Sequence, residues 1–456
     1  MGVPLRCSRR EALTLAGLGL AARAQASLRV PSGGALRLPS LAPRRPLEPS
    51  RAVDMADAWP LALLHGCIGS MVEGAVQWSL LTGPPTEDRG NPRLVTAWLR
   101  PGMTFADGSP LDADAVARSF TQASSAGPLA RCAMAMLERA GVEAAGPREL
   151  RLRLAAPGLL DDVLTAWPLA LTRGTSGLGP FAPAPGAPER LVPNARCPAG
   201  LPWLARVELA PAMPRNDELR AFTTLSLDAS WRGRALHGVT RPSERLQGAP
   251  SAVVGVLPTP HGVLDQDPAH ARALEALLSP LRAGSEPTLA PPGLVPSGAA
   301  ASEAQAVGAL RAALQRRDPQ RPLLRLARDP GDALLDAVAE RVVALFDAVQ
   351  VPVELVPSNG DGTLRAIAPL GASPALAVAS FLAVAGDEAH ASEVCRAPAS
   401  QRAALAAGHW GRGTAVLLGR TTPCLYLRAG VQGARFDECG RLLLGDAWLE
   451  RPRPRP

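Results

Sequence analysis

Strand-like and helix-like hydrophobic patterns alternate along this chain, and this alternation favours an α/β fold over an all-helical or all-β one. Leucine and arginine alternate through residues 150–154, as expected for a strand whose arginines face water. Residues 332–350 instead place apolar side chains every three or four positions, which predicts an amphipathic helix. Apolar stretches at 323–327 and 351–355 flank this helix, so the three segments predict a β-α-β unit with parallel strands.

The first 26 residues have the pattern of an export signal. Arg6, Arg9 and Arg10 precede an apolar run at 12–22 that is too short to span a bilayer. The arginine pair lies in a Ser-Arg-Arg-Glu-Ala-Leu string that fits the twin-arginine pattern, and small residues at 24–26 suit cleavage before Ser27. We therefore expect an exported, soluble protein of the periplasm.

Charge patterning gives no support for a nucleic-acid partner. Loss of the signal removes four arginines and one glutamate, which lowers the formal net charge from +7 to +4. The arginines are scattered along the chain, without a basic run interleaved with aromatic residues. We therefore expect no nucleic acid among the partners.

Six cysteines follow the signal, and none of their spacings resembles a zinc site or a redox pair. Cys424 and Cys439 flank a strand-turn-strand pattern and are candidates for a disulfide, with free buried thiols as the alternative. Neither His261 nor His409 has a converging partner in the sequence, so we expect no metal and no cofactor.

No pattern supports catalysis, so we expect the protein not to be an enzyme. Ser176 comes nearest to a G-x-S-x-G nucleophile elbow, but Leu178 stands where the last glycine belongs. Asp161 and Asp162 form a carboxylate pair in sequence, yet neighbours on a helix point in different directions.

Residues 99–120 read LRPGMTFADGSPLDADAVARSF and are the most specific part of the sequence. The end of a strand is followed by a Pro-Gly turn, Phe105 as an apolar plug, and an Asp-Gly turn. Asp112 and Asp114 then lie near the N-terminus of a helix, where carboxylates complement the dipole. This account predicts structure without chemistry.

The same string closely resembles the L-R-x-G-x-x-F-x-D-G-x-P-[LF]-x-A-x-D-V signature of the family 5 extracellular solute-binding proteins, with Ala115 as a small departure. This family contains the oligopeptide-, dipeptide- and nickel-binding receptors of ABC importers. Further stretches resemble family segments in the family's order. They are residues 47–49, 141–154, 177–181, 191–209, 267–274, 306–310, 422–425 and 431–433.

The resemblance implies a class II periplasmic-binding-protein fold, with two lobes about a hinge and an extra subdomain on lobe I. Mapped onto this chain, lobe I comprises residues 27–57, 174–249 and 415–448, and the subdomain comprises 58–173. Lobe II is then 250–414, and 449–456 form a tail. The implied function is capture of a peptide or similar small solute for an ABC permease by a protein expected to be a monomer.

Five candidates for ligand contact come from their positions in this scheme. Glu48 takes the place of the acid in the family's L-D-P string. Thr259 and His261 lie where the chain enters lobe II. Trp231 and Trp410 fall near the expected hinge and cleft, with burial in the core as the alternative for each tryptophan.

Lobe II departs from the family pattern. The family usually has a G-W-x-x-D-Y-x-D-P segment in lobe II, and the acid of this segment pairs with the amino group of the ligand. This chain has no clear counterpart of that segment. The nearest region, 370–395, offers Phe381 and Asp387 as the remaining candidates. This departure keeps open a second reading, in which an exported scaffold or interaction protein retains the fold without transport.

Overall fold

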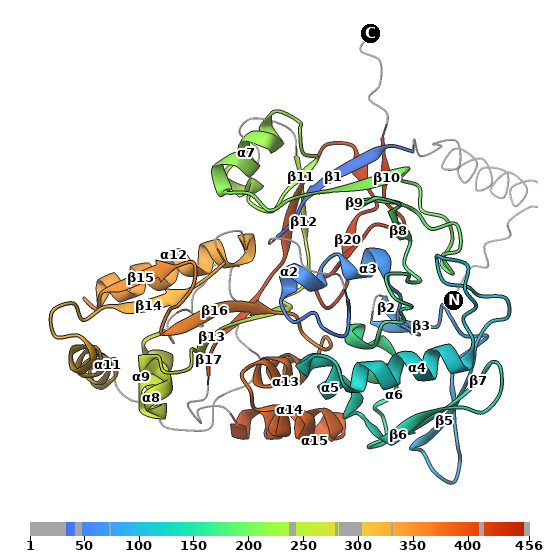
Figure 1. Cartoon of the computed structure of the whole chain (residues 1–456), viewed down its shortest axis with the longest axis horizontal. Coiled ribbons are helices and arrows are strands. Elements are labelled where there is room, and N and C mark those ends of the chain that lie inside the picture. The colour runs from blue at the N-terminus through green and yellow to red at the C-terminus, as the bar shows by residue number, and fades with distance from the viewer. Residues whose placement is uncertain are drawn as a thin grey trace, which may run out of the picture.

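The computed structural model describes residues 33–41, 48–72, 74–236, 243–278, 281, 303–329, 332–409 and 415–450. The predicted export signal, Trp410 and residues 451–456 lie outside this part of the chain. Helices and strands alternate through it, and the elements form two lobes and a subdomain (Figure 1). None of the described helices is both long and apolar enough to cross a membrane.

Lobe I contains two main sheets. Four strands lie in the order β1-β10-β9-β8, with β1 parallel to β10, and three lie in the order β11-β18-β12. Their bounds are Ala35–Pro39 (β1), Phe181–Ala184 (β8), Ala187–Pro193 (β9), Arg206–Ala210 (β10), Ala229–Ser230 (β11), Ser243–Gln247 (β12) and Cys424–Arg428 (β18). Helices α2 (Met55–Ala58), α3 (Leu61–Leu64) and α7 (Arg215–Thr223) and the 3-10 turn η2 (Gly233–Leu236) belong to this lobe.

Short strand pairs complete lobe I near the end of the chain. They are β19 (Val431–Gln432) with β22 (Trp448–Leu449), and β20 (Arg435–Phe436) with β21 (Leu442–Leu443). All six described cysteines are free thiols, including Cys424 and Cys439, which do not form the disulfide suggested by their positions in the sequence.

The subdomain is built on an antiparallel sheet of order β4-β5-β7-β6. Its elements are β2 (Ser70–Val72), β3 (Ala75–Gln77), β4 (Thr86–Glu87), β5 (Leu94–Trp98), β6 (Leu137–Ala144), β7 (Glu149–Leu154), α4 (Ala113–Ser124), α5 (Pro128–Met134), α6 (Leu160–Thr165) and η1 (Trp167–Leu169). The leucines of β7 are buried and its arginines exposed, as its alternating sequence predicts.

The 99–120 string folds as its local chemistry predicts. Gly102 and Gly108 take positive φ angles of 72° and 87° in the two turns, and the Phe105 side chain is buried. Asp112 caps α4, because its carboxylate accepts a hydrogen bond of 2.7 Å from the backbone N–H of Ala115.

Lobe II is a five-stranded sheet of order β15-β14-β16-β13-β17. Its strands are β13 (Ala252–Pro258), β14 (Leu324–Ala327), β15 (Val353–Val356), β16 (Gly362–Ile367) and β17 (Val416–Thr421). Its helices are α8 (Val263–Gln266), α9 (Pro268–Leu278), α11 (Glu303–Arg317) and α12 (Ala333–Ala348). Strand β14 is parallel to β15, and α12 connects them, which confirms the predicted β-α-β unit.

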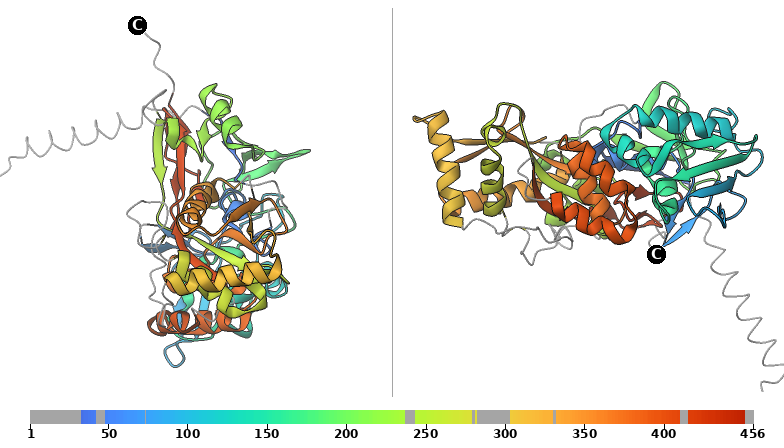
Figure 2. Two further views of the ribbon diagram at one scale, coloured as in Figure 1. Left: turned by 90° about the vertical axis from the view of Figure 1, so that its left-hand side faces the viewer. Right: turned by 90° about the horizontal axis from the view of Figure 1, so that it is seen from below.

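Three further helices lie between the lobe II sheet and the subdomain, as the view from below in Figure 2 shows. They are α13 (Pro374–Val384), α14 (Glu388–Arg396) and α15 (Ala399–His409). Arg131 of α5 binds Glu388 with a 2.8 Å hydrogen bond, and Arg402 of α15 binds Asp162 of α6 at 2.6 Å. These ion pairs attach the three helices to the subdomain.

The chain crosses between lobe I and lobe II at residues 248–251 and 422–423. The two crossings are hydrogen-bonded to each other, from Gly248 N–H to the Pro423 carbonyl at 2.9 Å and from Ser251 N–H to the Thr421 carbonyl at 3.0 Å. The family resemblance implies that the chain returns to lobe I at residue 415. The structure differs here, because β17 pairs with β13 and therefore belongs to the lobe II sheet.

Candidate functional site

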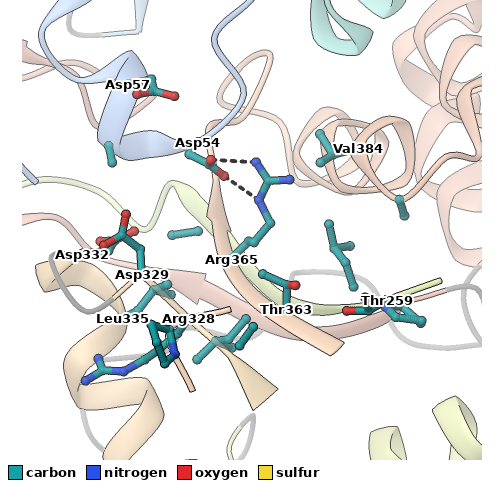
Figure 3. A pocket seen from close by; sticks show the side chains of 18 of the residues that line it. Asp54, Asp57, Thr259, Arg328, Asp329, Asp332, Leu335, Thr363, Arg365 and Val384 are labelled. Carbon is teal, nitrogen blue, oxygen red and sulfur yellow. Dashed lines mark hydrogen bonds and ion pairs between the residues drawn. The ribbon is translucent and has the colours of Figure 1, made fainter. Parts of the chain in front are cut away.

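A cavity of about 670 Å³ lies between the two lobes. Its lobe I wall comes from the start of α2, with Asp54 and Asp57 (Figure 3). Its lobe II wall comes from the ends of β13 and β14 and from the middle of β16. Each lobe therefore supplies part of one continuous lining, as a cleft that encloses a small molecule requires.

The polar part of the lobe II wall follows directly from the β-α-β unit. Arg328 and Asp329 come immediately after β14, and Asp332 immediately precedes α12. Loops at the carboxyl ends of parallel strands are the usual place for ligand contacts in α/β sheets. Asp332 is only 4% exposed and caps α12 by accepting a 3.0 Å hydrogen bond from Leu334 N–H.

One ion pair joins the lobes at the cavity wall. The guanidinium of Arg365 on β16 binds both carboxylate oxygens of Asp54, at 2.9 and 2.6 Å (Figure 3). Next to it, the N–H of Ala368 donates to the carbonyl oxygen of Val53 at 3.0 Å. Bidentate arginine–carboxylate pairs fix orientation as well as distance, so this contact sets the position of α2 against β16.

The lining carries more acid than base. Four aspartates contribute to it, at positions 54, 57, 329 and 332, against Arg328 and Arg365. Both arginines already bind carboxylates, Arg365 that of Asp54 and Arg328 that of Asp336 at 2.8 Å. The lining therefore contains more carboxyl than guanidinium groups, and three of its four aspartates outnumber the two arginines even with Asp332 protonated.

Burial raises the pKa of the Asp332 carboxyl to about 8, and the charges of Asp54, Asp329 and Asp336 act in the same direction. Asp332 therefore holds its proton at neutral pH. A positively charged group entering the cavity favours the ionised carboxylate, so binding of a cation is expected to release a proton there.

Replacing Asp332 by asparagine tests this pKa through stability. In the wild type the folded chain holds a proton that the unfolded chain releases near pH 4, so the free energy of unfolding falls as pH rises from about 4 to about 8. The asparagine side chain keeps the helix cap without the charge. The D332N variant is expected to gain stability relative to wild type across this window, by on the order of a few kcal/mol at pH 8 in urea unfolding. A difference that does not change between pH 4 and pH 8 would contradict the raised pKa.

Of the candidates Thr259, His261 and Glu48, the structure places only Thr259 in the cavity lining. Thr259 lines the cavity, and its hydroxyl oxygen is buried without a hydrogen-bond partner among the described residues. His261 is exposed outside the lining, with a φ of 67° and its N–H bonded to the Asp265 carboxylate at 3.0 Å. Glu48 lies outside the lining too, paired with Arg51 at 3.1 Å.

The aromatic and acidic candidates lie elsewhere. Phe381 is buried in the core beneath β13, and Asp387 binds the His390 ring at 2.5 Å at the start of α14. Trp231 is 8% exposed and packs edge-on against Trp59, with ring centroids 5.5 Å apart. It lines a second, smaller cavity.

The sequence analysis does not identify the charged residues of the cavity lining as candidates for ligand contact. Asp54 and Arg365 are 311 positions apart and meet only in the folded chain. Arg328 and Asp329 could have been identified from the sequence, because they directly follow a predicted strand, where ligand contacts are common. In the described part of the chain, no group of three or more His, Cys, Asp or Glu side chains could hold a metal ion.

Comparison with known proteins gives no match to a family model and none to a curated sequence. Solved structures do match over 92–93% of this chain and 100% of theirs. The murein tripeptide binding protein MppA of Escherichia coli has a TM-score of 0.74 at 14% identity. NikA from Staphylococcus aureus, solved in complex with Ni(L-His)2, and the substrate-binding domain of an oligopeptide ABC transporter from Bacillus anthracis each have a TM-score of 0.71 at 11% identity. This likeness establishes the α/β fold of the periplasmic binding proteins.

Proposed function

We propose that this chain is a solute-binding component of an ABC importer, related to the family 5 receptors, which holds a peptide or similar small solute between its lobes. The observation that carries this proposal is the cavity of about 670 Å³, whose lining comes from both lobes. Its volume lies within the range of about 300–1,000 Å³ typical of small-molecule sites.

Closure of the lobes is supported by contacts across the cleft. Besides the Asp54–Arg365 pair, Arg232 of lobe I binds Asp336 of α12 at 2.6 Å, and Arg215 binds Glu340 at 2.8 Å. The crossings at 248–251 and 422–423 form a hinge. A ligand that contacts both walls favours this closed arrangement by its differential affinity for it.

The lining also favours one class of solute. Among the described residues it contains no aromatic side chain, so ring stacking does not contribute to recognition by this part of the cavity wall. Its excess of aspartates favours a ligand with a positively charged group, such as the amino group of a short peptide. The buried Thr259 hydroxyl supplies a further polar contact.

The proposed setting follows from the N-terminal signal and from the relatives in fold. A twin-arginine-like signal would deliver the chain to the periplasm, where a monomer would pass its solute to a membrane permease. The Bacillus anthracis structure is the substrate-binding domain of an ABC transporter, which is consistent with such a partner. No step of this role requires catalysis.

Filling the cavity tests the proposal. Ala385 lines the cavity directly after α13. Ala385→Trp is therefore expected to abolish the rise in melting temperature that a short cationic peptide produces in the wild type. Ala404→Trp, on the exposed face of α15, adds the same ring and is the control that should keep the response. If no peptide or small amine stabilises the wild type, the scaffold function is favoured. If Ala385→Trp responds like the control, binding is outside this cavity.

A further inference from the structure

A second cavity, of about 250 Å³, also lies between the lobes. Lobe II contributes Ala333, Ala337 and Glu340, which share one face of α12, whereas Asp332 and Leu335 face the larger cavity. Lobe I contributes residues of β12 and β18 and the segment that follows β11. The first turns of α12 therefore separate two cavities.

Two buried aromatic residues form part of the lobe I wall, Trp231 and Tyr426, which are 8% and 3% exposed. The indole N–H of Trp231 donates to the Pro39 carbonyl at 2.9 Å, and its ring packs on Trp59. This contact fixes the ring orientation. The second cavity thus has a rigid aromatic wall, whereas the described lining of the larger cavity contains no aromatic side chain.

The charges of the second cavity are opposite to those of the first. Four arginines line it, at positions 215, 232, 234 and 245, against Asp336 and Glu340. Both acids are occupied, Asp336 by Arg232 and Glu340 by Arg215. Within the part of the chain that the structure describes, Arg234 and Arg245 form no ion pair, and the Arg245 Nε–H points to the Cys424 sulfur at 3.3 Å.

An arginine side chain keeps its positive charge at any pH at which the protein is folded. Two guanidinium groups that pair with no carboxylate among the described residues therefore give this cavity an excess of positive charge. A planar guanidinium fork matches a carboxylate, and an aromatic wall matches a flat apolar body.

We propose that this second cavity binds a small carboxylate with a flat apolar body, held by Arg234 and Arg245 against Trp231 and Tyr426. Because α12 belongs to lobe II and the other walls to lobe I, such a ligand contacts both lobes. It favours the closed arrangement by the same linkage as a solute in the larger cavity. The proposal concerns a different site from the proposed function and does not depend on it.

Benzoate is the probe that tests this assignment, followed by isothermal titration calorimetry on the full-length mature protein. Wild type is expected to bind benzoate saturably. The double variant Arg234→Gln/Arg245→Gln is expected to bind it at least about tenfold more weakly, because both charge-assisted contacts are lost. Arg272→Gln, which removes an exposed arginine of α9, is the matched control and should keep the wild-type affinity.

Three comparisons complete the test. Benzylamine has the same ring with a positive charge and should not bind, and inorganic phosphate should bind more weakly than benzoate because it has no ring. Ala385→Trp fills only the larger cavity, so this variant should still bind benzoate saturably. Equal affinity of the double variant and the wild type, or loss of benzoate binding in Ala385→Trp, would overturn the assignment.

Discussion

Replacing Arg232 by methionine is expected to lower the free energy of unfolding by about 3–5 kcal/mol, because the change leaves a buried charge unpaired. The Arg232 side chain is 4% exposed, and it binds Glu218 at 2.5 Å and Asp336 at 2.6 Å. Glu218 is fully buried, and it also accepts hydrogen bonds from the Ser230 hydroxyl and the Arg232 N–H. Without the guanidinium, its charge stays buried without a counter-charge.

Two further variants separate this buried pair from ordinary surface charge. Arg232→Met combined with Glu218→Gln should recover part of the loss, since no buried charge then remains unpaired. Arg215→Met removes an exposed pair, with side chains 51% and 66% exposed, and should cost less than about 1 kcal/mol. Urea unfolding followed by tryptophan fluorescence measures all three. A loss for Arg232→Met as small as that for Arg215→Met would show that the network does not stabilise the lobe interface.

The second large effect is expected at Gly255, in the middle of β13. A Cβ atom there would overlap the ring of Phe381 and approach the Val416 carbonyl oxygen to 2.6 Å. The oxygen belongs to the backbone of the neighbouring strand and cannot move without distorting the sheet. Gly255→Ala is therefore expected to destabilise the protein by about 3 kcal/mol, at the upper end of typical overpacking costs.

Gly308→Ala is the matched control, because Gly308 is exposed on α11 and an added Cβ meets nothing within 4 Å. This change should stabilise the protein by about 0.4–1 kcal/mol. Phe381→Leu in the Gly255→Ala background relieves the overlap with the ring and should recover part of the loss in urea unfolding. A neutral Gly255→Ala variant would mean that Phe381 does not pack against β13.

Local patterns predicted much of the fold. The alternation in residues 150–154 predicted β7, the period of 332–350 predicted α12, and the 99–120 string predicted two turns and a capped helix. Each depends on side chains that are near one another in sequence, where the periods of strands and helices and the chemistry of caps apply directly.

The cavity was harder to predict because its lining is assembled from distant segments. Asp54 and Arg365 are bound to each other in the folded chain, yet neither has a distinguishing neighbour in sequence. The two aromatic candidates within the described residues illustrate the same limit. Phe381 and Trp231 each have a ring on which a ligand could stack. Both are mostly buried, because a large ring in a lobed α/β protein also serves to fill its core.

The boundary of the lobes shows how pairing overrides sequence position. Residues 415–421 were expected to belong to lobe I, but β17 pairs with β13 along its length. The true crossing comes next to the first one, where hydrogen bonds join residues 248–251 to 421–423. Sheet partners that are separated by more than a hundred residues cannot be read from the local period of either strand.

Native mass spectrometry of the protein purified from its own host most directly tests the claim that the interlobe cavity holds a solute. The wild type and Ala404→Trp are expected to carry one small non-covalently bound molecule with a cationic group, and Ala385→Trp is expected to be empty. An empty wild type that also remains empty after incubation with short peptides would contradict the proposed function, as would a bound molecule that persists in Ala385→Trp.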